Sequence, residues 1–336
     1  MMPTSEYKDR DNLRNNITSS GALTTLALVS FLCGFLCALF GEFVFPLYCA
    51  SLAALFLYDK YTKRVLSVSL CVIVIVLNIL LGSYIPTAVV FAPFAALVLS
   101  FTYKKGISKG ECAGYMTAIC SLMIVVGVFF FAMLAVKELS FTAAIEYFKA
   151  MYQNISDEII SFVEEAASSV TSESVPTEFS EETVSLLLSS LVLVIPSLVV
   201  IIGFLLSGLT CKIFCFIVSR FSDKPELIVN WRFSTGSIFA YFYIVVVIFS
   251  ALVGAYDVFG IALANVQNVY MFVYAYIGFN YARFILSLRR SSFFSTVVLV
   301  AVIVALSSFA ISILSFLGVY FTVIKNKQVA GGGNAV

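Results

Sequence analysis

The apolar run at residues 258–287 contains polar side chains whose spacing would place them on one face of a helix. Successive members are three or four positions apart, which is the spacing of neighbours along an α-helical face. The members of this stripe are Asn265, Asn268, Phe272, Tyr276, Asn280 and Arg283. Such groups could bind a small molecule through hydrogen bonds, or they could join neighbouring helices. The sequence leaves both interpretations open.

An unsatisfied polar group in hydrocarbon is costly, so we expect the amide stripe to face the interior of a helix bundle. A further amide, Asn78, lies in the apolar run 65–82 and could pair with the stripe. Arg283 lies near the predicted cytoplasmic end of its helix and could instead extend its guanidinium to the membrane interface. The candidate ligand-binding residues are therefore Asn265, Asn268, Tyr276, Asn280, Arg283 and Asn78.

Several kinds of catalytic chemistry have no matching residues in this sequence. The chain has no His, which removes histidine general acid–base catalysis and histidine metal ligation. It also lacks the GxGxxG, Walker and HExxH patterns. We therefore expect no enzyme activity, no cofactor and no ATPase site within the chain.

Two cysteine pairs, Cys33/Cys37 and Cys211/Cys215, are each spaced four apart. Two thiols alone are a weak metal signal, so packing of small residues between helices is the favoured interpretation and no metal site is expected. Since no Cys falls in the long polar segment 138–183, we also expect no disulfide framework.

Small residues repeat every four positions in the first apolar run. Its row of Ser30, Gly34 and Ala38 has the small-xxx-small spacing that lets another helix approach closely. The pattern predicts helix packing there, either within the bundle or against another membrane subunit.

The composition indicates one polytopic membrane protein. Hydrophobic residues make up 61% of the 336 residues and charged residues 12%, whereas soluble domains are nearer half apolar and a quarter charged. Apolar runs of about 20 residues predict membrane helices, and the predicted fold is an all-α bundle of eight or nine of them. The runs lie near 21–40, 43–58, 65–82, 84–101, 112–136, 184–210, 236–256, 258–287 and 293–324. Membrane lipid is the obligatory partner, and a net charge of +1 indicates no nucleic-acid partner.

The distribution of charge predicts the orientation and the domains. Basic residues exceed acidic ones in 59–64, 103–111 and 212–232, whereas 138–183 has ten acidic residues and one Lys. The positive-inside rule then places the first three in the cytoplasm and 138–183 outside. The expected units are a cytoplasmic tail 1–20, a five-helix region 21–137, the acidic outer segment 138–183, a membrane region 184–324 and a tail 325–336. Whether 293–324 is one span or a hairpin stays open, as does the side of the C-terminus.

The outer segment contains its own apolar stripe at helical spacing. This stripe comprises Phe141, Ile145, Phe148, Tyr152, Ile155, Ile159, Phe162 and Ala166. An amphipathic helix is predicted, lying across the outer surface of the bundle or capping a binding cavity. Residues 184–220 then read as one long helix, with Pro196 as the expected kink.

Several stretches together resemble the YybS-like family of uncharacterised multi-pass bacterial membrane proteins. They are VFPLYCASLAALFLY, LVLVIPSLVVIIGFLLSGLTCKIF, NWRF, YAYIGFNYARFIL and LSFLGVYFTVIKNK, in that order. The N-terminal helices are also similar to S-components of energy-coupling-factor transporters. That similarity implies a substrate-binding subunit whose first helix docks a scaffold subunit.

Two functions follow as expectations. The first is a transporter-like membrane subunit that binds a small molecule and depends on other membrane subunits or an ATPase module for energy. The alternative is a non-transporting scaffold or regulator in the cell envelope.

Overall fold

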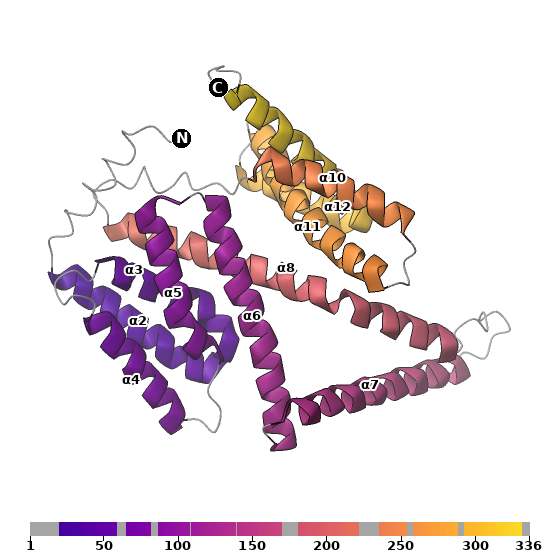
Figure 1. Ribbon diagram of the computed structural model, residues 1–336, viewed down its shortest axis with the longest axis horizontal. Coiled ribbons are helices and arrows are strands. Elements are labelled where there is room, and N and C mark those ends of the chain that lie inside the picture. Colours follow the sequence, from indigo (N-terminus) through magenta and orange to yellow (C-terminus); the bar gives the residue numbers. More distant parts are fainter. Residues whose placement is uncertain are drawn as a thin grey trace.

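The described part of the chain is helical throughout in a computed structural model (Figure 1). The structure describes residues 20–58, 65–81, 87–107, 109–138, 140–169, 181–221, 235–253, 258–287 and 292–330. The helices are α2 (Ser20–Phe40), the 3-10 helix η1 (Gly41–Val44), α3 (Phe45–Tyr58), α4 (Val65–Leu81), α5 (Thr87–Lys105), α6 (Lys109–Val136), α7 (Phe141–Ser169), α8 (Glu181–Phe221), α10 (Ser237–Leu252), α11 (Val258–Ser287) and α12 (Ser292–Ala330). The predicted all-α class is confirmed. The tails 1–20 and 325–336 lie largely outside the described residues.

Four of the described helices are long and apolar enough to cross a membrane. These spans are Thr87–Lys105, Gly110–Val136, Val192–Arg220 and Val258–Leu286. Shorter apolar helices accompany them at Leu23–Cys37, Phe45–Tyr58, Val65–Leu80, Ser237–Leu252 and Phe309–Ile324. The total of eight or nine crossings and their orientation stay predictions.

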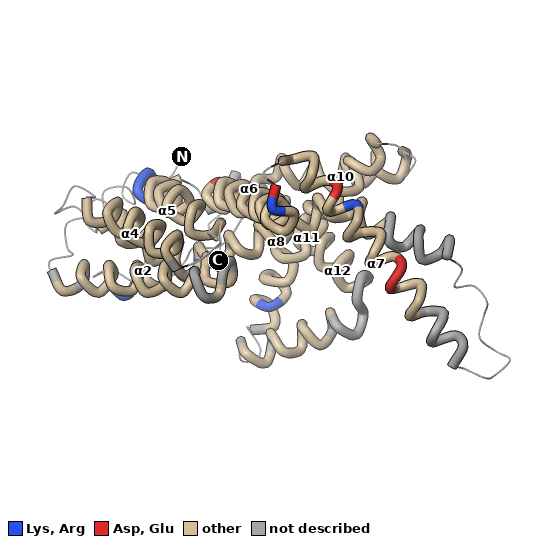
Figure 2. The backbone as a smooth tube through the Cα atoms, turned by 90° about the horizontal axis from the view of Figure 1, so that it is seen from below, with Lys and Arg blue, Asp and Glu red and all other residues tan. Residues whose placement is uncertain are grey.

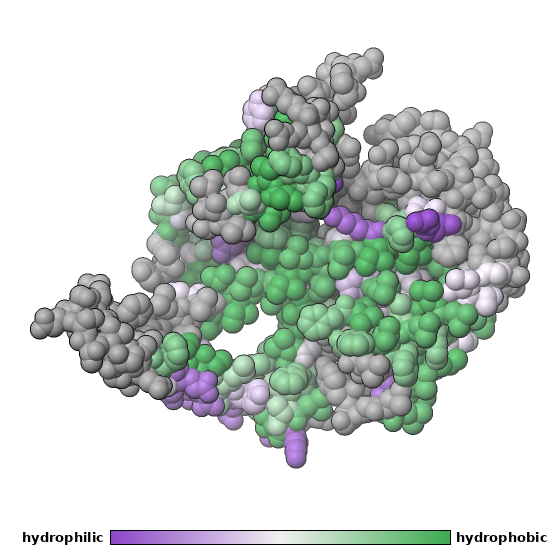
Figure 3. All heavy atoms as spheres, turned by 180° about the vertical axis from the view of Figure 1, so that it is seen from behind, coloured by the Kyte–Doolittle hydropathy of each residue, from purple (hydrophilic) through white to green (hydrophobic). Residues whose placement is uncertain are grey.

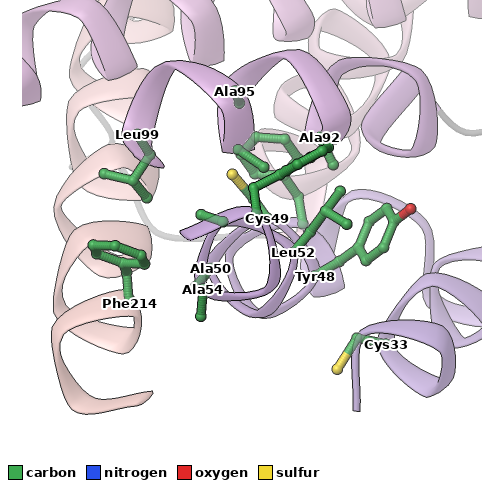
Figure 4. Packing of buried hydrophobic residues seen from close by; sticks show 14 of the residues in the cluster. Cys33, Tyr48, Cys49, Ala50, Leu52, Ala54, Ala92, Ala95, Leu99 and Phe214 are labelled. Carbon is green, nitrogen blue, oxygen red and sulfur yellow. The ribbon is translucent and has the colours of Figure 1, made fainter. Parts of the chain in front are cut away.

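The N-terminal helices pack around α3. Most of its side chains are fully buried, because α2, α4, α5 and the C-terminal half of α8 surround it. Small residues such as Ala50 and Ala54 let these neighbours come close. Figure 4 shows α3 end-on, with Leu99 and Phe214 on one side and Tyr48 pointing the other way.

A second, smaller core joins α10, α11 and α12. Tyr243 of α10 stacks on Tyr274 of α11 at 5.3 Å between ring centroids, and its hydroxyl lies 2.9 Å from the Ser315 hydroxyl of α12. The helix α12 is continuous from Ser292 to Ala330, so the single-helix alternative for this run holds and the hairpin alternative is wrong.

The remaining helices form a triangle. α7 starts at the C-terminal end of α6 and runs to the start of α8, while α6 and α8 pack together at their other ends (Figure 1). The predicted helix in 138–183 and the predicted single long helix through Pro196 are both present, whereas the outer location of α7 stays a prediction. α7 therefore does not lie across the bundle, because it meets α6 and α8 and leaves a space between them. Figure 2 shows acidic positions on α7, whereas most of the described backbone carries no charged side chain.

Candidate functional site

Asn265 lies where α11 passes α8, and its side chain is bound to the α8 backbone. Its Nδ2 donates to the Leu193 carbonyl at 2.8 Å and to the Ile261 carbonyl at 3.0 Å. Its Oδ1 accepts the backbone N–H of Ser197 at 3.0 Å. In a regular α-helix the Ser197 N–H would donate to the Leu193 carbonyl, four residues earlier. The Asn265 amide thus bridges a donor and an acceptor that are normally paired with each other.

Pro196 explains why these two backbone groups need a bridge. Proline has no N–H, and its ring collides with the carbonyl four residues earlier, which opens the helix at this turn. Freed backbone groups at membrane depth must be satisfied by neighbouring protein. Asn265 fulfils that need and uses both of its amide N–H donors in doing so. Its position is therefore explained by helix structure, whereas ligand binding by Asn265 stays a prediction.

The other stripe residues are spread over different environments. Tyr276 is half-buried against Phe204 of α8, with ring centroids 5.7 Å apart. Asn280 is exposed and donates to the Tyr276 carbonyl of its own helix at 2.8 Å. Arg283 is also exposed, near the end of α11. The stripe therefore does not share one buried surface.

The side chain of Asn268 differs from those of the other stripe amides. Asn268 is half-buried, and its side-chain amide makes no hydrogen bond to a described residue. One such amide can contribute to a binding surface, but it does not define one. Ligand binding at this position stays a prediction.

Asn78 lies in the N-terminal unit, where it faces α2. Its Nδ2 donates to the Val74 carbonyl at 2.8 Å and lies 3.5 Å from the Gly34 carbonyl. The expected pairing of Asn78 with the α11 stripe is wrong, since these contacts hold it against α2 and α4. The side chain is 1% exposed, and its Oδ1 has no hydrogen-bond partner among the described residues.

Two more buried polar atoms without a described partner belong to α2 and α3, and both of these helices contact α4, which carries Asn78. They are the hydroxyls of Ser30 on α2 and Tyr48 on α3, and both residues are 0% exposed. Gly34 of α2 is the common neighbour of these residues. Asn78 contacts its carbonyl, and Ser30 lies one turn earlier on the same face of α2. A Cβ built on Gly34 would lie 2.9 Å from Tyr48 Cε2, so the tyrosine ring packs directly on this glycine.

We call Ser30, Tyr48 and Asn78 the Gly34 polar cluster. A buried polar group left without a partner costs about 1–3 kcal/mol, so native proteins almost always supply one, often as ordered water or a ligand. Asn78 and Tyr48 contact Gly34 and Ser30 lies one turn before it, so these groups mark a candidate binding site within the described residues. The sequence analysis selected Asn78 as a ligand residue but placed Ser30 in helix packing and did not select Tyr48.

The small-residue row of α2 packs inside the N-terminal unit. A Cβ on Gly34 would lie 2.7 Å from Val74 Cγ1, which shows how closely α4 approaches α2 here. Ser30 is buried on the same face, and the side chain of Ala38 lies outside the described residues. The described part of this row is thus covered by the chain itself.

A closer helix crossing was not predicted. A Cβ on Gly278 of α11 would overlap the Leu314 carbonyl of α12, and a Cβ on Gly318 would overlap the Tyr274 carbonyl. Gly278 and Ala282 are four apart, so the small-residue pattern could have indicated this crossing. Gly318 and Thr322 are also four apart, so the same pattern occurs on the partner helix.

Thiols are buried rather than assembled into a metal site. All eight cysteines are free, and seven of them are buried. Cys112 lies 3.1 Å from the Thr102 hydroxyl, a contact between α6 and α5. Within the ranges that the structure describes, no three His, Cys, Asp or Glu residues are grouped so that they could hold a metal ion.

Comparison with known proteins places this helical membrane architecture in a family. The family of predicted membrane proteins DUF2232 matches residues 23–320, which is most of the 336-residue chain. The chain belongs to this family. No curated protein and no solved structure matches it. DUF2232 membership agrees with membrane localisation.

Proposed function

We propose that this DUF2232 protein is a transporter-like membrane subunit that binds a small molecule and has no ATPase of its own. The observation that carries the proposal is the Gly34 polar cluster, three buried side chains that each have one oxygen without a described partner. Each would be destabilising in an empty apolar core. A bound molecule that completes the hydrogen bonds of all three groups would remove this cost.

The chemistry of the cluster indicates the class of ligand. Asn78 Oδ1 can only accept hydrogen bonds, whereas the Ser30 and Tyr48 hydroxyls can both donate and accept. None of the three is charged at neutral pH, and an unpaired charge buried beside them would be strongly destabilising. We therefore propose a small neutral molecule that offers at least one hydrogen-bond donor to Asn78.

Energy for transport would come from another subunit. The sequence contains no Walker pattern, so a membrane subunit or an ATPase module would have to drive release of the ligand. The similarity of the N-terminal helices to S-components supports a binding subunit of this kind. The proposal includes no enzyme activity and no cofactor.

The decisive experiment compares Tyr48→Phe with the unaltered protein. If the cluster is dry, removing an unsatisfied hydroxyl should raise the thermal unfolding temperature. If a ligand occupies it, the same change should lower that temperature and reduce the amount of a compound detected by mass spectrometry after gentle purification. Tyr115→Phe is the control, because Tyr115 is 54% exposed. A stabilised Tyr48→Phe protein with no retained compound would contradict the proposal.

The alternative function, a scaffold or regulator in the envelope, is favoured by a different observation. Much of the apolar stripe of α7 is exposed, including Phe162 at 71%. A second protein could cover this face. Co-purification of envelope-synthesis or division proteins would support this alternative, whereas co-purification of ATPase subunits would support transport.

A further inference from the structure

α7 is an amphipathic helix whose apolar face is largely uncovered by the described protein. Near its start, Phe141 stacks on Phe129 of α6 at 4.7 Å between ring centroids, and Phe148 meets the same ring edge-on at 5.6 Å. Beyond these two ring contacts α7 diverges from α6. Ile155 and Ile159 in the apolar stripe are then 39% and 37% exposed.

The space beside this face passes through the molecule. Figure 3 shows an opening bordered by α6, α7 and α8. Exposed apolar side chains occur on both membrane helices along this part of the chain; they include Val125, Val128 and Phe131 on α6 and Val192, Ile195 and Leu198 on α8. Water in such an opening would contact mainly hydrocarbon, which is unfavourable.

We propose that acyl chains of membrane lipids fill this opening and cover the apolar face of α7, which lies at the membrane–water interface. The contacts at Phe129 carry the argument, because they join the apolar face of α7 to α6, a helix long and apolar enough to span a membrane. An amphipathic helix in this position buries its apolar face at the boundary between headgroups and chains. This inference does not depend on the proposed ligand of the Gly34 polar cluster.

The charges of α7 agree with this placement and limit the kind of lipid contact. Glu146, Asp157 and Glu158 lie off the apolar stripe and are exposed, so they can remain in water. An acidic polar face is not attracted to anionic headgroups, unlike the basic face of most interfacial helices. Binding should therefore rest on apolar area, and it should persist in vesicles of neutral phosphatidylcholine and at high salt.

Tryptophan fluorescence of the full-length protein in such vesicles can test the proposal. The chain has a single Trp, so Trp231→Phe supplies a background for one new probe. Ile159→Trp places the probe on the apolar stripe. Ser161→Trp is the matched control, since a step of two residues on a helix turns the side chain to nearly the opposite face.

We expect dibrominated phosphatidylcholine to quench the probe at position 159 at least several-fold more than the probe at 161. Aqueous iodide should show the reverse order, and 1 M salt should change neither result. Equal iodide access at both positions would overturn the proposal and indicate an aqueous opening. Protection of position 159 from both quenchers would overturn it in favour of a protein partner.

Both variants must first pass a folding check that does not depend on the lipid. Their thermal unfolding in detergent should match that of the Trp231→Phe parent. If Ile159→Trp fails this check, Ile155→Trp reads the same stripe one turn earlier.

Discussion

The backbone N–H of Ser197 on α8 donates a 3.0 Å hydrogen bond to Oδ1 of Asn265 on α11. Ser197 follows Pro196, so this bond repairs the helix turn that proline disrupts. It also links two cores. The C-terminal half of α8 places Phe214 in the N-terminal core, whereas α11 places Tyr274 in the C-terminal core. Asn265 therefore adds a hydrogen-bonded link between the two parts of the protein to the ring contact of Tyr276 with Phe204.

Replacing Asn265 by Leu should destabilise the protein. The change removes three hydrogen bonds and leaves the Ser197 N–H and the Leu193 carbonyl without their partner, at a cost of about 1–3 kcal/mol. The free energy of unfolding in mixed micelles measures the effect. Asn268→Leu is the matched control, because the structure gives Asn268 no hydrogen bond to a described residue.

A double-mutant cycle can separate the helix repair from other effects of Asn265. In a Pro196→Ala background the α8 backbone can close its own hydrogen bonds, so Asn265→Leu should cost less there. The difference between the two costs is the coupling between Pro196 and Asn265. Equal costs in both backgrounds would show that Asn265 acts independently of the proline.

Any side chain added at Gly278, where α11 crosses α12, should destabilise the protein. Gly278→Ala would drive a methyl group into the Leu314 carbonyl, and backbone cannot move aside as a flexible side chain can. We expect a loss of about 1–3 kcal/mol or more in unfolding free energy. Gly208→Ala on α8 is the control, since a Cβ there would meet nothing within 4 Å. Comparable melting temperatures for the two variants would contradict the close approach.

Gly34 should respond differently, because side chains surround it. A Cβ at Gly34 would lie 2.7 Å from Val74 Cγ1, so Gly34→Ala should destabilise the N-terminal unit. Trimming the neighbour with Val74→Ala should recover part of the loss, because space becomes available on α4. Thermal unfolding of the single and double variants checks this. If the double variant loses more unfolding temperature than the two single variants lose together, the two residues do not compete for space.

Secondary structure was the predictable part of this fold. Each apolar run that was predicted became a helix, because spacing and length report directly on local structure. The relations between helices were not predictable, since they depend on which faces meet. Asn265 and Pro196 were both noticed in the sequence, but nothing in the pattern showed that one would repair the other. The Gly34 polar cluster was hidden for the same reason: Ser30, Tyr48 and Asn78 come from three helices, and only packing brings them together.

The orientation of the chain can be tested by thiol labelling. The acidic segment 138–183 is predicted to lie outside, and the basic loop 103–111 inside. A membrane-impermeant maleimide on intact cells should therefore label Ser168→Cys and should not label Ser108→Cys. The native thiols give little background, because seven of the eight are buried and Cys215 is half-buried. After the membrane is permeabilised, both positions should react, which confirms that each variant is present. Labelling of Ser108→Cys on intact cells, with Ser168→Cys protected, would invert the orientation and place α7 at the inner face of the membrane.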